Sequence, residues 1–555
     1  MKKTVFLFLA FFLSPLAQAW GIDYSASIFS FLQGYRIEAQ GNYDEAIESY
    51  RKALAADPGS ADIRTELALV YIKKSNFPKA EELLKKAIEI NGTNRNALIL
   101  LAGLYQAEKD PGKAKSLYER CIALDDEDTE AYLHLGAIYI TERKYDQAIK
   151  TYEKVLAYDE DNILTLYYMG RLHAELKLYD KAAAFLTKVL ELKPNFEPAL
   201  MDLGTIYELE GNFDKAIDLY QKIVVLDPDN KRARSRIAAV YVRRKQYDRA
   251  IHEFEKLSDV DRGDLSIRIK IGLLHLEEGR FDEAIREFNF LLASQPKNNS
   301  VRYYVAVAWK EKGNIKEAIR QFLQIEPNAE EFMDAAKNIA FLYVKTGEID
   351  EGIEKFKGFT AAKKDSVDLY ILLSSLYEEK GDFRKGIETL NEARRLFPTN
   401  VDLLYQIGML HEKAGETDKA LSIMQEVLKL DPEYAHALNF IGYTWAEKGI
   451  NLDQAEEMIK KALQKRPEDA YILDSIGWVY YKKGNYKMAL TEILKATQSL
   501  PDDPTIAEHL GEVYMSMRDY RNAVESFERS GRLEKKEDKK RALDKKIKEA
   551  QDKIK

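Results

Sequence analysis

The stretch that decides the fold is Gly211-Asn212-Phe213-Asp214-Lys215-Ala216-Ile217-Asp218-Leu219-Tyr220, which is followed eight residues later by Pro228. The same order of glycine, ring, acid, alanine and second ring recurs along the chain. An alanine or glycine occupies the position of Ala216 once every 34 residues, with a single step of 35. These positions are Ala46, Ala80, Ala114, Ala148, Ala182, Ala216, Ala250, Ala284, Ala318, Gly352, Gly386, Ala420, Ala455, Ala489 and Ala523. A fixed period of this length is typical of a helical repeat array.

Two further positions keep the same period and explain how paired helices would pack. Twelve residues before each of these alanines, or thirteen at the 35-residue step, the chain has glycine, alanine or serine. A large group such as Tyr207 or Trp309 follows three residues later, and an anchor such as Phe254 follows four residues after the alanine. Small residues let two antiparallel helices approach closely, and large groups fill the space beside the crossing. Proline recurs where each second helix should end, at positions 58, 194, 228, 296, 398, 432, 467 and 501.

Fifteen such units fit in register between residues 27 and 537, and on these residues the chain resembles the tetratricopeptide repeat (TPR) family. The resemblance implies an all-α fold, a right-handed superhelical solenoid of about 15 helix-turn-helix repeats. It also implies that the first helix of each repeat lines a concave groove. Stacked repeats would then form an extended surface that binds proteins.

The repeats are expected to form two blocks, repeats 1–9 over residues 27–332 and repeats 10–15 over residues 333–537. Pro327 cannot continue a helix, so the second helix of the ninth repeat should end early. Glycine then replaces the usual alanine in the next two repeats, which weakens them slightly. We therefore expect a joint between the two blocks within residues 326–366.

The first 19 residues have the pattern of a secretory signal peptide. Lys2 and Lys3 precede a short apolar run over residues 5–13, and Ala17-Gln18-Ala19 offers a small-residue cleavage site. The run is too short to span a membrane, which takes about 20 residues. No cysteine follows it, so no lipid anchor is expected. The mature chain, with a lead-in over residues 20–26, is predicted to cross the inner membrane and to be periplasmic, and peripheral association with the outer membrane stays open.

Residues 538–555 are strongly charged and carry apolar residues at helical spacing, namely Leu543, Ile547, Ala550 and Ile554. A solenoid needs a solvated cap on its last repeat, and we expect this amphipathic helix to supply it. The alternative is a basic contact with an acidic surface such as anionic lipid. The apolar stripe is narrow, which favours the cap.

Composition and motifs argue against several functional classes. The formal net charge is −8, whereas nucleic-acid binding would need a basic footprint. The single cysteine, Cys121, occupies a packing position that is alanine in other repeats, so we expect a buried thiol. The histidines show no metal-ligand spacing, there is no glycine-rich phosphate loop, and the repeats use nearly the whole chain. We therefore predict no enzyme, no catalytic residues, no metal and no cofactor.

Carrying the groove positions of the TPR family onto the last four repeats gives ten candidate partner-binding residues. They are Tyr405, Met409, Glu412, Asn439, Tyr443, Asp474, Trp478, Tyr481, Glu508 and Glu512. Aromatic rings combined with amide and carboxylate groups suit an extended peptide or a partner helix. The alternative is that these residues only pack neighbouring repeats together. The lysine and asparagine positions with which some TPR domains hold acidic C-terminal tails are not found.

A more specific resemblance covers residues 438–443, 473–480 and 508–514, which are similar to the C-terminal half of bacterial envelope TPR adaptor proteins. The resemblance implies a non-catalytic adaptor that brings a periplasmic protease or a cell-wall enzyme to its substrates. Some of those proteins are lipoproteins, and this chain lacks their acceptor cysteine. Two other roles are left open: a scaffold of an exopolysaccharide, pilus or secretion assembly, and a glycan-binding groove.

Overall fold

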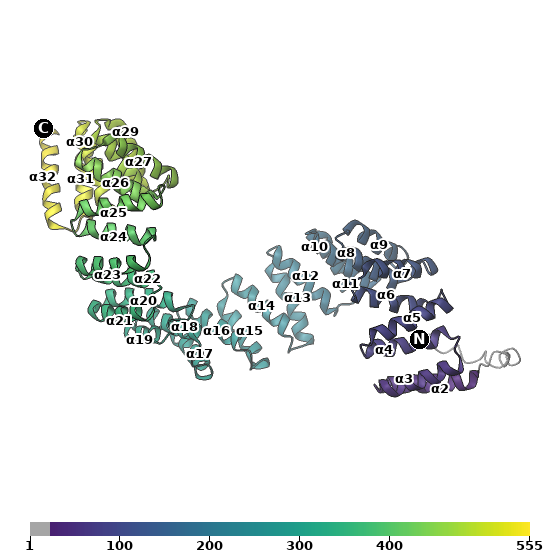
Figure 1. Cartoon of the computed structure of the whole chain (residues 1–555). Coiled ribbons are helices and arrows are strands. Elements are labelled where there is room, and N and C mark those ends of the chain that lie inside the picture. Colours follow the sequence, from purple (N-terminus) through teal and green to yellow (C-terminus); the bar gives the residue numbers. More distant parts are fainter. Residues whose placement is uncertain (1–22, 555) are drawn as a thin grey trace. The chain divides into compact units, whose positions relative to one another are not determined.

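The structure, a computed structural model, describes residues 23–554 (Figure 1). The predicted signal peptide and the start of the lead-in lie outside the described residues. Over residues 23–554 the chain forms 31 helices, α2 to α32, and no strand. The contacts divide the chain into two compact units, with the division between Ile267 and Arg268.

The first unit contains seven helix pairs. They are α2 (Tyr24–Ala39) and α3 (Tyr43–Ala56), α4 (Ala61–Lys73) and α5 (Phe77–Ile90), α6 (Arg95–Ala107) and α7 (Pro111–Leu124), α8 (Thr129–Thr141) and α9 (Tyr145–Tyr158), α10 (Ile163–Glu175) and α11 (Tyr179–Leu192), α12 (Glu197–Leu209) and α13 (Phe213–Leu226), and α14 (Lys231–Arg243) and α15 (Tyr247–Val260).

The second unit contains eight pairs and a last helix, and its first helix spans the division. The helices are α16 (Leu265–Glu277) and α17 (Phe281–Ser294), α18 (Asn299–Glu311) and α19 (Ile315–Phe322), α20 (Phe332–Thr346) and α21 (Ile349–Ala362), α22 (Val367–Glu379) and α23 (Phe383–Leu396), α24 (Val401–Lys413) and α25 (Thr417–Leu430), α26 (Ala435–Lys448) and α27 (Leu452–Lys465), α28 (Ala470–Lys482) and α29 (Tyr486–Ser499), α30 (Pro504–Ser516) and α31 (Tyr520–Leu533), and α32 (Glu537–Ile554). The predicted all-α fold of about 15 repeats with a C-terminal helix is confirmed. The winding of the array stays a prediction.

The repeated alanine and the small residue before it form the centre of each pair. Ala216 is fully buried, and a Cβ added at Gly204 would lie only 2.5 Å from Cε1 of Tyr220. The group that fills the crossing is therefore the anchor four residues after the alanine. The ring that follows the glycine by three residues lies beside it, with Lys215 Nζ 5.1 Å from the centroid of Tyr207. Close approach of the two helices depends on the missing side chain at the glycine.

Helix caps and turns repeat with the same period. Side chains at the N-caps of the first helices, such as Asn94, Asp128 and Asn162, accept hydrogen bonds from backbone N–H groups of the first turn. These caps satisfy donors that the helix itself cannot. The turn inside each pair needs a positive φ, which Gly211 adopts at 76° and Arg143 at 57°. The boundaries of both helices are thus set locally in each repeat.

The ninth repeat is irregular, as Pro327 predicts. Its second helix, α19, has 8 residues and ends at Phe322, whereas α17 has 14. The early end is confirmed. One apolar core nevertheless continues from Ala306 to Tyr377 across this repeat. The boundary at residues 332 and 333 lies inside the second unit, and the joint within 326–366 stays a prediction.

The last helix packs against the last repeat. The helix α32 lies beside α31 (Figure 1). Leu543 and Ala550 of α32 are buried in a cluster with Ala523 and Phe527 of α31. The prediction of a capping helix is confirmed. Among the described helices, none combines the length and the apolar character that crossing a membrane requires.

Candidate functional site

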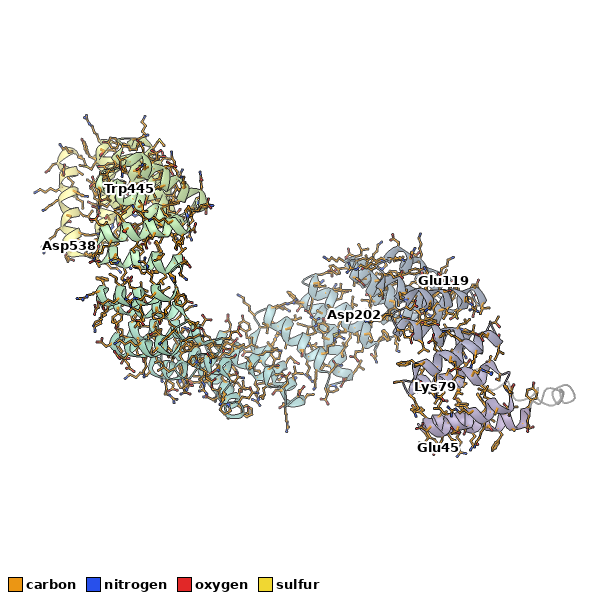
Figure 2. All side chains as sticks on the ribbon, in the orientation of Figure 1. Glu45, Lys79, Glu119, Asp202, Trp445 and Asp538 are labelled. Atoms are coloured by element: carbon orange, nitrogen blue, oxygen red, sulfur yellow. The ribbon has the colours of Figure 1, made fainter. Side chains whose placement is uncertain are left out.

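A cavity of about 490 Å³ lies in the second unit on the first helices of the last four repeats. These helices, α24, α26, α28 and α30, take the same place in successive repeats, and Trp445, labelled in Figure 2, lies on α26. The lining residues are Tyr405, Met409, His436, Asn439, Phe440, Tyr443, Asp469, Tyr471, Ile472, Asp474, Ser475, Asp503, Thr505 and Ile506. Ligand pockets in proteins usually measure roughly 300–1,000 Å³. The cavity is therefore large enough for one or two side chains of a bound segment.

Helix caps determine which residues face this cavity. Oδ1 of Asp469 accepts a hydrogen bond of 3.1 Å from the backbone N–H of Tyr471 at the start of α28. Oδ1 of Asp503 accepts one of 2.8 Å from the backbone N–H of Thr505 at the start of α30. A cap of this kind fixes where a helix begins. It therefore also fixes which side chains the helix presents to the cavity.

The structure brings half of the ten predicted groove residues together around the cavity. Those that line it are Tyr405, Met409, Asn439, Tyr443 and Asp474. The other five, Glu412, Trp478, Tyr481, Glu508 and Glu512, are not among its lining residues. All ten are buried or partly buried, so each also packs against its neighbours. Their role in partner binding stays a prediction.

Trp478 lies inside the packing of the last repeats. Only 7% of it is exposed, and its ring stacks on His509 at 3.9 Å between centroids and on Tyr481 at 4.6 Å. Its indole N–H donates to the carboxylate of Glu447. Removal of a buried tryptophan side chain typically costs about 3–5 kcal/mol. A change at Trp478 would thus alter stability as well as any binding.

Asp474 is the most deeply buried acid in the cavity lining. It is 5% exposed, and its Oδ2 lies 2.8 Å from Nδ1 of His509. Among residues 23–554 no donor reaches the other oxygen, Oδ1, which is itself buried. A buried acceptor without a partner costs about 1–3 kcal/mol. The carboxylate is therefore oriented through one oxygen, and its other oxygen is buried without a donor from the described residues.

Two more buried acceptors belong to side chains of α24 and α26, the helices that carry Tyr405 and Tyr443. In the described part of the chain, Oδ1 of Asn439 and Oε2 of Glu412 also have no hydrogen-bond donor. Burial raises the pKa of Tyr443 far above its usual value, and the charges of Glu447, Asp474, Glu508 and Glu412 raise it further. These four carboxylates all act on the same phenol. This surface is rich in hydrogen-bond acceptors and in negative charge.

Basic side chains near the cavity include two histidines and an arginine. No lysine or arginine is among the lining residues. Burial lowers the pKa of His436 below its usual value, the charge of Arg466 lowers it further, and that of Asp469 opposes the shift. Arg466 lies 4.0 Å from Asp469 at the edge. Burial alone would lower the pKa of His509 at the base, but Asp474, followed by Glu447 and Glu508, raises it above the usual value.

Glu508 and Glu512 already bind an ammonium group from their own chain. Nζ of Lys546 on α32 lies 2.6 Å from Glu508 and 2.5 Å from Glu512. Burial alone would lower the pKa of Lys546, but the two carboxylates raise it. The first helix of the last repeat therefore holds a lysine side chain in the folded chain.

A second cavity, of about 540 Å³, lies among α21, α22 and α23. Lysines and glutamates line it together, namely Lys357, Lys364, Lys385, Glu388 and Glu392. None of the buried side-chain acceptors found without a partner in residues 23–554 lines this cavity. It offers less to a ligand than the cavity at Asp474. Within the same residues no group of His, Cys, Asp or Glu side chains is arranged to hold a metal ion.

Family models for the tetratricopeptide repeat match residues 38–268 in overlapping segments, and also residues 269–331, 377–441 and 507–541. The matches cover more than half of the chain. The chain belongs to the tetratricopeptide repeat family. No curated protein sequence matches this TPR chain.

Several solved structures are similar to the chain. One is a tetratricopeptide repeat protein from Parabacteroides merdae, with 17% identity over 45% of this chain and 99% of that chain, at a TM-score of 0.36. Another is the C-terminal part of a TPR repeat-containing protein from Cytophaga hutchinsonii, with 19% identity over 43% of this chain and 99% of that chain, at a TM-score of 0.37. A third is the Cut9–Hcn1 hetero-tetramer of APC/C, with 18% identity over 89% of this chain and 97% of that chain, at a TM-score of 0.33. No partner follows from these similarities.

TPR arrays are generally non-catalytic scaffolds that bind peptides or partner proteins through stacked helices. The family assignment therefore supports a protein–protein interaction adaptor. Within the TPR array, sequence reasoning missed the lining residues that lie at helix starts, among them Asp469, Tyr471 and Asp503. A signal for two of them was present, since Asp469 and Asp503 are aspartates 34 residues apart that precede helical segments.

Proposed function

We propose that this TPR chain is a non-catalytic adaptor of a bacterial cell envelope, which holds a segment of a partner protein over α24, α26, α28 and α30. The cavity at Asp474 carries the proposal, because it combines aromatic area with buried acceptors on the helices that bind partners in this family. The predicted signal peptide supports a periplasmic location, and peripheral association with the outer membrane stays open. The partner would be a periplasmic protease or a cell-wall enzyme together with its substrates.

The test is affinity capture with residues 20–555 from the envelope of the source cells, followed by mass spectrometry. Tyr471→Ala is the site variant, because Tyr471 lines the cavity and is 58% exposed. Phe341→Ala on α20 is the matched control, since Phe341 is 59% exposed and is not a lining residue. We expect Tyr471→Ala to reduce capture and Phe341→Ala to leave it unchanged.

The identity of the captured material distinguishes the candidate roles. A protease recovered with cell-wall hydrolases supports the adaptor. Components of a polysaccharide, pilus or secretion system would favour the assembly scaffold instead. Glycan without protein would contradict both and favour a sugar-binding groove. Equal loss of capture in both variants would mean that the cavity is not the binding site.

A further inference from the structure

We propose that the cavity at Asp474 accepts a lysine side chain from an extended segment of the partner protein, with the ammonium group on Oδ1 of Asp474. This inference rests on the proposed function and specifies the chemistry of its site. A buried carboxylate oxygen is the starting point. Asp474 is 5% exposed, and Oδ1 has no donor among the described side chains and backbone groups.

Asp474 cannot satisfy its second oxygen by a rearrangement of its own. An asparagine amide can be turned so that its N–H₂ group replaces its oxygen, but a carboxylate carries acceptors only. Oδ2 is already 2.8 Å from Nδ1 of His509. Rotation of the carboxylate would therefore only change which of its two oxygens lacks a donor. The described side chains and backbone groups therefore leave Oδ1 without a donor, which a bound ligand can supply.

The charge of the lining selects a cation. Asp469, Asp474 and Asp503 line the cavity, and no lysine or arginine does. Opposite charge comes from Arg466 beside Asp469 and from Lys546, which pairs with Glu508, and His509 lies beneath Asp474. Against them stand the three aspartates and the carboxylates of Glu412, Glu447 and Glu508, which act on Tyr443 in the same wall. The negative groups outnumber the positive ones, which disfavours an acidic peptide.

The rings of the lining add to the attraction for a cation. Tyr405, Phe440, Tyr443 and Tyr471 all contribute to the wall. Aromatic faces attract ammonium groups, and tyrosine and phenylalanine both do so. The methylene stem of a lysine can pack on the same rings while its charged end reaches the carboxylate.

The geometry at Asp474 favours lysine over arginine. Arginine recognises carboxylates best with two parallel N–H groups on both oxygens. One oxygen of Asp474 is held by His509, so this two-point contact is not open. An ammonium group needs a single oxygen and can turn its other donors elsewhere, for example to Asn439, whose Oδ1 is also a buried acceptor without a donor in residues 23–554.

The chain contains an internal example of the same contact. On α30, the first helix of the next repeat, Glu508 and Glu512 lie 2.6 Å and 2.5 Å from the ammonium group of Lys546 of α32. The Lys546 side chain is partly buried between α30 and α31, and its Nζ lies 5.8 Å from the ring centroid of Phe527. The proposed contact repeats this arrangement with a lysine of another protein.

The test selects peptides against residues 20–555 from a phage-displayed library of random ten-residue peptides. We expect one position to be enriched in lysine. In the selected peptide, exchange of that lysine for acetyl-lysine should weaken binding at least about tenfold, because a desolvated charge pair loses one partner. Exchange for arginine should weaken binding less than acetylation does.

Asp474→Asn is the site variant, because it removes the charge and keeps the shape. Asp502→Asn is the matched control, since Asp502 is exposed and is not a lining residue. The cost of acetylation should fall to about twofold in Asp474→Asn and stay unchanged in Asp502→Asn. The helicity and melting temperature of both variants show whether they fold. If Asp474→Asn does not fold, the acetylation series on the unchanged chain still tests the inference.

Three outcomes would overturn the lysine site: no enrichment of lysine, enrichment of acidic residues, or an acetylation cost that Asp474→Asn leaves intact. If free lysine binds as tightly as the selected peptide, the occupant of the cavity is a small molecule, and the proposal of a protein segment is wrong. Failure here is distinguishable from failure of the adaptor role. If envelope partners are captured and capture is insensitive to Asp474→Asn, the adaptor stands and the lysine site falls.

Discussion

Replacing Gly477 by alanine should destabilise the second unit, although alanine is the better helix former. A Cβ at this residue of α28 would lie 2.5 Å from Cγ1 of Ile493 and 3.2 Å from the backbone oxygen of Ala489, both on α29. Ordinary carbon contacts are about 3.5–4.0 Å long, so the two helices must separate by about 1 Å. Ile493 is fully buried and branched at Cβ, and therefore cannot withdraw.

The expected magnitude follows from two opposing effects. Overpacking of a core costs about 1–3 kcal/mol, and the exchange of glycine for alanine in a helix gains about 1 kcal/mol. The rigid neighbours place the cost in the upper half of its range. We expect a net loss of about 1–2 kcal/mol for Gly477→Ala. Gly358→Ala on α21 is the control, because a Cβ there meets nothing within 4 Å, and it should gain about 0.5–1 kcal/mol.

Hydrogen exchange followed by mass spectrometry is the suitable assay, since a repeat array opens locally and has no single unfolding free energy. The opening free energy of amides in α28 and α29 should fall in Gly477→Ala, and that in α21 should rise in Gly358→Ala. Ile493→Ala should cost less in the Gly477→Ala background than in the unchanged chain. Equal stabilisation by both glycine substitutions would refute close packing at this crossing.

Three further predictions concern single side chains. Cys121 is fully buried and burial raises its pKa to about 11, so Ellman's reagent should label it only after unfolding, and rapid labelling of the folded chain would contradict the packing. The raised pKa of His509, which faces Asp474, Glu447, Glu508 and Tyr443, adds stability that is complete below its unfolded pKa of about 6.5 and is lost as pH rises through the folded value. Amide protection in α28 and α30 should therefore fall as pH rises above about 6.5, after correction for intrinsic exchange, and His509→Gln should remove this slope. Lys546→Gln should weaken the docking of α32 by about 1 kcal/mol, seen as faster exchange in α32, whereas Lys553→Gln, at the exposed end of that helix, should change little.

The fold could be predicted because the residues that determine how each helix pair packs lie within that repeat. Gly204, Ala216 and Tyr220 lie within one helix pair, so their spacing alone indicates how the pair closes. Pro327 likewise acts on its own helix, and α19 ends early as predicted. Such effects need no knowledge of how successive repeats stack.

The candidate site was predicted less completely because it depends on contacts between repeats. Trp478 occupies a groove position, but stacking on His509 from the next repeat buries it. Asp474 is separated from His509 by 35 residues, and nothing local to either residue indicates that one carboxylate oxygen is bonded and the other is not. Which groove residues face a ligand is decided by these neighbours.

One recurring ion pair restricts how this array can change in length. Asp282 pairs with Lys312, Asp350 with Lys380 and Asp418 with Lys448, always 30 residues apart and between neighbouring repeats. These three pairs are spaced by 68 residues, which is two repeats, and a further pair of the same kind, Asp453 with Lys483, follows one repeat after Asp418. Loss of the 34 residues after Asp350 would bring Ala414 opposite it, whereas loss of 68 would bring Lys448 there. Between Asp282 and Lys380, duplication or deletion by two repeats at a time conserves the ionic register that a single-repeat event would break, whereas loss of the 35 residues after Asp418 would bring Lys483 opposite it and keep a pair.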